Sequence, residues 1–318
     1  MAVFFCSTQI QYFCWRMEFK VINQEVIGFN KNVSLFIKRE DLIHPYISGN
    51  KYRKLKYNLE QAKAENQATL LTFGGAFSNH IAAVAFAGKE YGFKTIGIIR
   101  GDELNSQINN NPTLLFAQQC GMKFVFETRE KYRHKNEVTY QADLMAQFGQ
   151  FFLIPEGGTN ELAIKGCEEI LTQEDAVFDY ICCCVGTGGT ISGIINSSMN
   201  HQKVIGFPAL KGDFLKEDIR KYAKNNRWEL NLDYHFGGYA KIDKALIQFM
   251  NFFLENTKIQ LDPVYTGKML FGLYDLVEKG FFPNGSKILA IHTGGLQGIQ
   301  GMNIKLEQLH LPKIKIHV

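Results

Sequence analysis

Short apolar runs recur along the chain, and stretches with helical periodicity lie between them. Eight runs predict strands, because they are nearly continuously apolar, as burial on both faces of a sheet requires: residues 33–39, 68–73, 94–100, 123–127, 151–155, 180–185, 203–207 and 287–292. Helices are predicted at residues 79–92, 113–121, 138–149 and 160–173. This alternation predicts an α/β fold of mostly parallel sheets that helices cover on both faces.

Changes in this pattern near residues 47 and 150 predict two three-layer α/β/α lobes with a cleft between them. The large domain would comprise residues 1–47 and 151–318, and the small domain residues 48–150. Residues 1–16 are aromatic and apolar, match neither a strand nor a helix, and lack the basic start of a signal peptide. We expect them to be an extension outside a fold that begins near Met17.

The composition excludes several classes of protein. The chain has 318 residues, 46% of them hydrophobic and 21% charged, with a net charge of +4. Its basic residues are mixed with acidic ones, so nucleic acid is not an expected partner, and no apolar run is long enough to cross a membrane. The seven cysteines have no metal-binding spacing. We therefore predict no metal site, and we interpret the cysteines as core residues of a cytoplasmic protein.

Four predicted strands end in loops with double glycines: FGGAFSNH (73–80), PEGGTNE (155–161), VGTGGTISG (185–193) and HTGGLQG (292–298). Ligands of open α/β sheets bind beyond the carboxyl ends of the strands. VGTGGTISG predicts an anion site, because glycines follow a strand and a helix begins near Thr190. It is not a Walker loop, and Ile191 replaces the last glycine of the dinucleotide fingerprint. A single phosphate group is therefore the expected ligand rather than a nucleotide.

A second signal is SGNKYRKLKYNL, residues 48–59, which predicts a helix start with Ser48 or Asn50 as the N-cap. Its first turns hold four cations at an end of the helix that already carries positive charge, namely Lys51, Arg53, Lys54 and Lys56. Two neighbouring cations and the helix end should lower the pKa of Lys51. An uncharged amine can form a Schiff base with an aldehyde, and an anion would relieve the repulsion. Pyridoxal phosphate carries both groups. The alternative is a solvated basic helix face without a ligand.

Several motifs together resemble one family. KREDLIHPYISGNKYRKLKYNL, GGAFSNH, GTGGT, LDPVYTGK and HTGG occur in the order found in 1-aminocyclopropane-1-carboxylate (ACC) deaminases and D-cysteine desulfhydrases. These are pyridoxal-phosphate enzymes of the tryptophan-synthase-β-like fold, fold type II. The resemblance covers roughly residue 20 to the C-terminus, and it implies a homodimer that acts on a small amino acid.

The resemblance also implies roles for individual residues. Lys51 matches the lysine that binds the cofactor covalently and later removes a proton from the substrate, and Asn50 and Lys54 flank it, with Lys54 as a phosphate partner. Asn79 matches the asparagine that bonds the cofactor's ring hydroxyl, and Ser78 resembles a residue for the substrate carboxylate or for proton relay. The phosphate cradle corresponds to Thr187, Gly188, Gly189 and Thr190. Tyr265 and Tyr239 match two active-site tyrosines, either of which could protonate the leaving group. His80 and His292 are interpreted as packing or hydrogen-bonding residues.

Thr266 distinguishes the two activities. Deaminases of the family read DPVYEG, with a glutamate that faces the ring nitrogen of the cofactor, whereas desulfhydrase-like members read DPVYTG, as this chain does. A threonine supplies no counter-charge for a protonated nitrogen, so the resemblance predicts β-elimination from D-cysteine, giving pyruvate, ammonia and sulfide. A threonine that is turned away from the ring would remove this argument.

Other functions remain open. Within the fold they are ACC deaminase and a lyase or racemase acting on serine-type substrates. From another class, a non-catalytic protein that binds a phosphate ligand could keep GTGGT but would not need Lys51 and Asn79 together. A nucleotide-dependent enzyme is not indicated, because the sequence has neither a Walker lysine nor a ribose-binding acid at the right distance.

Overall fold

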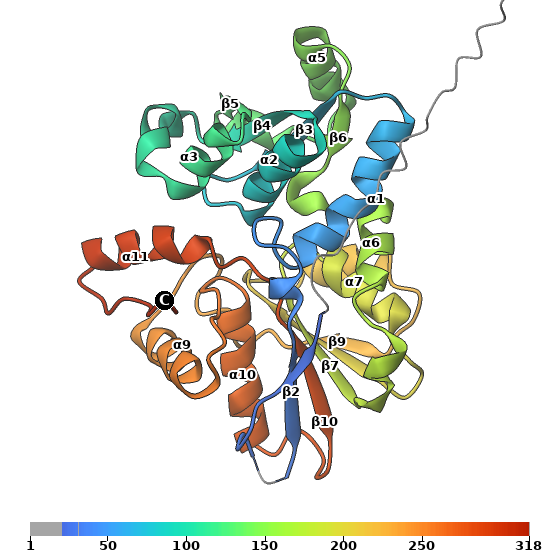
Figure 1. Cartoon of the computed structure of the whole chain (residues 1–318), viewed down its shortest axis with the longest axis vertical. Coiled ribbons are helices and arrows are strands. Elements are labelled where there is room, and N and C mark those ends of the chain that lie inside the picture. Colours follow the sequence, from blue (N-terminus) through green and yellow to red (C-terminus); the bar gives the residue numbers. More distant parts are fainter. Residues whose placement is uncertain (1–20, 31, 318) are drawn as a thin grey trace, which may run out of the picture.

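The computed structural model describes residues 21–30 and 32–317 of the chain (Figure 1). The expectation that residues 1–16 are an extension lies outside these residues. Two sheets, one above the other in Figure 1, organise the fold, and helix α1 (Asn50–Ala64) runs along the junction between them.

The larger sheet has six strands in the order β1-β2-β10-β7-β8-β9. Only the β1–β2 pair is antiparallel, and the other pairs are parallel. The smaller sheet has the order β5-β4-β3-β6 and is parallel throughout. The strand bounds are β1 Asn23–Glu25, β2 Ser34–Lys38, β3 Thr69–Gly74, β4 Lys94–Arg100, β5 Lys123–Glu127, β6 Phe152–Ile154, β7 Tyr180–Val185, β8 Lys203–Pro208, β9 Trp228–Leu230 and β10 Lys287–Ile291. The predicted α/β fold with mostly parallel sheets is confirmed.

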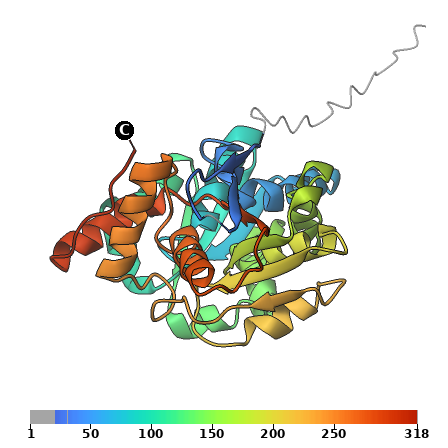
Figure 2. The ribbon, with the colours of Figure 1, turned by 90° about the horizontal axis from the view of Figure 1, so that it is seen from below.

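Eleven α-helices cover these sheets within the described residues: α1, α2 (Asn79–Tyr91), α3 (Pro112–Gln119), α4 (Arg129–Arg133), α5 (Val138–Phe148), α6 (Glu161–Glu168), α7 (Gly189–Ser197), α8 (Leu215–Arg220), α9 (Lys244–Thr257), α10 (Thr266–Glu278) and α11 (Gly298–Gln308). Seen from below, α9, α10 and α11, in orange and red, lie on one side of the larger sheet, and α6 and α7 lie on the other (Figure 2). The sheet is therefore buried on both faces, as its apolar strands require.

The cysteine run in β7 shows how the larger sheet divides its core. Cys182 and Cys184 are buried in the cluster that includes α9 and α10, whereas Cys183 lies in the cluster on the opposite face, with α7. This alternation is the two-residue period of a strand. Three consecutive cysteines therefore serve two separate cores, and among the described residues no group of three metal-binding side chains could hold an ion.

The N-cap predicted for α1 is wrong. The helix is preceded by Gly49 at φ 59° and ψ −137°, and no side chain caps it. A Cβ atom on Gly49 would lie 1.9 Å from the carbonyl oxygen of Thr293, and the backbone N–H of Asn50 donates to that same oxygen. The start of α1 is thus pressed against the HTGG loop, which leaves no room for a capping side chain.

The division into two domains stays a prediction. Strand β6 pairs with β3, so the smaller sheet extends to Ile154, beyond the expected boundary at residue 150. Helix α1, placed in the small domain by the sequence, packs closely on α6, since a Cβ atom on Gly166 would lie 1.9 Å from the carbonyl oxygen of Arg53. Contacts therefore cross the predicted boundaries at both places.

Candidate active site

The glycine loops predicted to bind a ligand meet where the carboxyl ends of the two sheets face each other. The side-chain amide of Asn50 donates to the hydroxyl of Thr190 at 2.7 Å, which joins α1 to α7. Gln297, after the HTGG loop, donates to the side-chain oxygen of Asn79 at 3.0 Å, which joins this loop to α2. Because the N–H of Asn50 also donates to the carbonyl of Thr293, three segments that are distant in sequence meet at the start of α1, namely α7, the HTGG loop and α2.

The four cations of α1 divide into two paired and two unpaired side chains. Arg53 makes two hydrogen bonds of 2.9 Å with the buried carboxylate of Glu40. Lys56 pairs with Glu169 at 2.7 Å. Lys51 and Lys54 pair with no carboxylate in the part of the chain that the structure describes, and both donate instead to the carbonyl oxygen of Gly157, at 3.1 and 2.9 Å. Only these two amines are directed into the site.

Burial is the main reason why the pKa of Lys51 is lowered well below its usual value, and the positive charge of Lys54 is the second. Burial also lowers the pKa of Lys54, which is 2% exposed. The predicted direction for Lys51 is confirmed, but crowding by both neighbours is not the cause, because Arg53 is turned away toward Glu40. Lys51 is therefore an amine that loses its proton readily.

The GTGGT loop forms a cradle beside the two amines. Gly188 has a φ of 83°, and a Cβ atom on Gly189 would lie 3.1 Å from the Nζ of Lys54 and 2.8 Å from the hydroxyl of Thr159. The hydroxyls of Thr159 and Thr187 are 2.6 Å apart, and Lys54 donates to Thr159 at 3.1 Å. The first N–H groups of α7 have no partner within the helix. Positive charge therefore gathers at the start of α7, beside the hydroxyls of Thr159 and Thr187, which suits a phosphate group.

Ser78 and Asn79 lie at the start of α2. Ser78 is its N-cap, and its oxygen accepts hydrogen bonds from the backbone N–H groups of His80 and Ile81, at 3.2 and 3.3 Å. These two N–H groups are therefore not available to a substrate carboxylate, whereas the hydroxyl hydrogen of Ser78 is. Asn79 faces the HTGG loop, because a Cβ atom on Gly295 would lie 2.5 Å from its side-chain nitrogen.

The two histidines of these loops are buried. His292 contacts the carbonyl oxygen of Gln260 at 2.6 Å and accepts from the N–H of Gly294. His80 contacts the hydroxyl of Thr72 at 2.8 Å, and its Nδ1 has no hydrogen-bond partner among the described residues. Burial lowers the pKa of His80 well below its usual value, followed by the charges of Lys51 and Lys54. These contacts fit the structural roles expected for both residues.

Tyr265 and Thr266 begin α10. The phenol of Tyr265 faces the GTGGT loop, since a Cβ atom on Gly186 would lie 3.2 Å from its oxygen. The ring of Tyr239 lies across that of Tyr265, with centroids 6.2 Å apart. Burial raises the pKa of both tyrosines, so their phenols stay protonated at neutral pH.

The hydroxyl of Thr266 is already bonded. It donates to the buried carboxylate of Asp262 at 2.9 Å and accepts from the backbone N–H of Asp262 at 2.8 Å. The same carboxylate accepts from the backbone N–H groups of Val264, Tyr265 and Thr266. Asp262 thus accepts hydrogen bonds from the backbone at the start of α10 and from the hydroxyl of Thr266.

Sequence reasoning missed two groups at this site: the carbonyl of Gly157 and the carboxylate of Asp262. The N-cap rule does not single out Asp262, because Asp262 lies three residues before the N-cap, Tyr265. Gly157 could not be found either, because its role depends on contacts with α1, about a hundred residues away.

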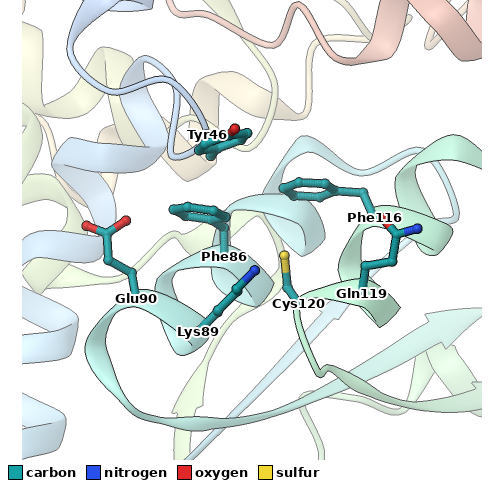
Figure 3. Close-up of a pocket in the computed structure, with 7 residues that line it drawn as sticks. All are labelled: Tyr46, Phe86, Lys89, Glu90, Phe116, Gln119 and Cys120. Atoms are coloured by element: carbon teal, nitrogen blue, oxygen red, sulfur yellow. The ribbon is translucent and has the colours of Figure 1, made fainter.

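A hollow on the outside of the small sheet's helices is separate from this site (Figure 3). It is lined by Tyr46, Phe86, Lys89, Glu90, Phe116, Gln119 and Cys120. It holds no residue of the glycine loops and neither of the two amines, so the chemistry described above does not belong to it.

Comparison with known proteins agrees with the geometry. Residues 24–294 match the family described as pyridoxal-phosphate dependent enzymes. The chain is 31% identical, over 83% of its length and 85% of the relative's, to the putative ACC deaminase of Pyrococcus horikoshii. It is 30% identical, over 86% of its length and 75% of the relative's, to the mitochondrial bifunctional D-cysteine desulfhydrase/ACC deaminase of Arabidopsis thaliana. The crystal structure of an ACC deaminase homologue matches with a TM-score of 0.79 and 28% identity, covering 92% of this chain and 94% of that one.

The amines, the cradle and the relatives lead to the same assignment. The chain belongs to the family of pyridoxal-phosphate dependent enzymes, and within it to the fold type II lyases that comprise ACC deaminases and D-cysteine desulfhydrases.

Proposed function

We propose that Lys51 binds the cofactor covalently and that the enzyme releases ammonia from a small amino acid. The observation that carries this proposal is the pair of amines, Lys51 and Lys54, which meet at the carbonyl of Gly157 without a carboxylate among the described residues. When bound, pyridoxal phosphate supplies an aldehyde for the amine and a conjugated ring that accepts electrons.

The chain's own residues would divide the remaining tasks. Lys54 and the first N–H groups of α7 hold the phosphate. The Nζ of Lys51 has a lowered pKa, so it can take up a proton from a substrate carbon near neutral pH. The hydroxyl hydrogen of Ser78 is free to bond the substrate carboxylate. The protonated phenols of Tyr265 and Tyr239 can donate a proton to a departing group.

ACC is the substrate that the relatives favour, since most of their names are ACC deaminase. The argument from Thr266 against this substrate is weaker in the structure than in the sequence. The carboxylate of Asp262 lies one hydrogen bond behind the threonine, so negative charge is not absent from this part of the site. We therefore propose ACC deamination as the first activity to test. D-cysteine β-elimination is the second, favoured by the threonine at position 266.

The products separate these activities. ACC would give 2-oxobutanoate and ammonia, whereas D-cysteine would give pyruvate, ammonia and sulfide. The experiment supplies ACC, D-cysteine, L-cysteine and D-serine to the purified holoenzyme and identifies the keto acid by mass spectrometry. Protein that stays colourless with added pyridoxal phosphate and gives no keto acid from any of the four would favour a non-catalytic binding protein.

The variant Thr266→Glu tests the role of this position. If the missing counter-charge favours elimination, the variant should lose activity toward D-cysteine relative to ACC. Thr266→Ser, which keeps the hydroxyl, is the matched control. An unchanged ratio of the two activities in Thr266→Glu would show that Thr266 does not select the substrate.

We also propose that the enzyme is a cytoplasmic homodimer, as the resemblance to its family implies. The five cysteines of the described residues are free thiols, which is typical of a reducing compartment. Among the described helices, none is long and apolar enough to cross a bilayer. Sedimentation equilibrium would give the mass of the assembly, and a monomer at micromolar concentration would contradict the dimer.

A further inference from the structure

The loop of residues 235–240, HFGGYA, carries Tyr239 in an unusual backbone conformation. Phe236 and Ala240 have φ values of 53° and 52°, in the left-handed region that side chains disfavour. Gly237 and Gly238 also have positive φ values, of 86° and 116°. Such a conformation persists only where the surroundings hold it.

Lys268 stabilises this conformation through hydrogen bonds to the loop. Its side chain is 2% exposed, and its Nζ donates to the carbonyl oxygens of His235 at 2.9 Å and Gly238 at 2.7 Å. Burial lowers the pKa of Lys268 to about 8, and the charge of Asp262 opposes this shift. Burying an amine against neutral carbonyls is unfavourable by itself. The two hydrogen bonds offset this cost and attach the side chain of Lys268 to the loop of residues 235–240.

The position of Lys268 links the loop to the site. Lys268 and Tyr265 belong to the same first turn of α10, and the ring of Tyr239 crosses that of Tyr265 at 68°. One turn of helix therefore supplies both the surface against which Tyr239 packs and the amine that holds the residue preceding it.

We infer that Lys268 is a positioning residue, which fastens the loop of residues 235–240 to α10 and so sets the phenol of Tyr239 against Tyr265. The importance of Tyr239 for turnover rests on the proposed function, whereas the fastening of the loop does not. Lys268 acts through the loop, and its own amine is bonded to two carbonyls rather than directed at the cradle.

The first test needs no substrate. Lys268→Met keeps the apolar stem of the side chain and removes both hydrogen bonds, and Lys305→Met is the control at an exposed position of α11. Chymotrypsin should cut after Phe236 or Tyr239 at least about tenfold faster in Lys268→Met, because two hydrogen bonds to a charged donor are lost. Lys305→Met should be cut at the wild-type rate. Equal cutting in all three proteins would overturn the inference.

A second test connects the loop to turnover. Lys268→Met should lower kcat while the visible absorbance of the bound cofactor is unchanged, and Lys268→Arg, which keeps the donors, should recover most of kcat. Adding Lys268→Met to Tyr239→Phe should cause little further loss, because both changes act through the same phenol. Fully additive losses would overturn the positioning role. If circular dichroism shows that Lys268→Met does not fold, both tests are repeated with Lys268→Gln.

Discussion

Replacement of Lys54 by methionine tests how the site controls the charge of Lys51. The substitution keeps the length and the apolar stem of the side chain and removes only its amine. Because the charge of Lys54 is the second cause of the lowered pKa of Lys51, the variant should raise that pKa. Burial of Lys51, the first cause, is expected to persist.

The size of the effect follows from the geometry. Both Nζ atoms bond the same oxygen, at 3.1 and 2.9 Å, so they are at most 6.0 Å apart. Two unit charges at that distance repel by about 3 kcal/mol at an effective dielectric constant of about 20. Removing this repulsion should therefore raise the pKa of Lys51.

Competitive labelling of cofactor-free protein with acetic anhydride measures this pKa, because only the uncharged amine reacts. The extent of labelling of the Lys51 peptide is followed by mass spectrometry between pH 6 and 11. Lys54→Met should move the midpoint upward, whereas Lys56→Met, whose amine pairs with Glu169, should not. A midpoint that stays within half a unit of wild type in Lys54→Met would refute the electrostatic reasoning.

Three further changes probe the scaffold of the site. Glu40→Gln leaves the buried guanidinium of Arg53 with only the more distant carboxylate of Glu169, at 3.7 Å, and it should lower the free energy of unfolding in urea by about 3 kcal/mol; a loss below 1 kcal/mol would contradict the pair's role. Gly49→Ala forces a Cβ atom toward the carbonyl of Thr293 at a positive φ, and should cost about 2 kcal/mol or more in the same assay; wild-type stability would show that the chain can move there. Lys268, with a pKa lowered from 10.5 to about 8, loses its proton in the native state before the unfolded state does, so the free energy of unfolding should rise with pH between these values. Lys268→Met should remove that rise, and an identical pH slope in the variant would contradict the shift.

The sequence predicted the sheets well because buried parallel strands are continuously apolar. All eight expected strands are present, within one or two residues at each end. The strands β1 and β9 were not predicted, since three residues are too few to show a period. Helix α6 ends at Glu168, five residues before the predicted end at residue 173, which is more than the usual one- or two-residue uncertainty of helix ends.

The site was less predictable, because the sequence does not show which charges are paired. Arg53 and Lys56 looked equivalent to Lys51 and Lys54 in the sequence, and only the fold brings Glu40 and Glu169 to them. The predicted N-cap of α1 was wrong for a similar reason, because the close approach of the HTGG loop is a tertiary contact that the sequence does not show. By contrast, Lys51 and the GTGGT loop could be singled out, because several motifs together resemble one family, whereas the charges of residues 48–59 alone also fit a solvated basic helix face.

The central claim is that Lys51, rather than Lys54, forms the covalent bond to the cofactor. Borohydride reduction of the holoenzyme, followed by digestion and tandem mass spectrometry, locates the modified lysine directly. We expect the reduced cofactor on Lys51 alone, and we expect Lys51→Ala to lose the visible absorbance and to take up no borohydride-stable label. A cofactor attached to Lys54, or yellow colour retained by Lys51→Ala after borohydride treatment and dialysis, would contradict it.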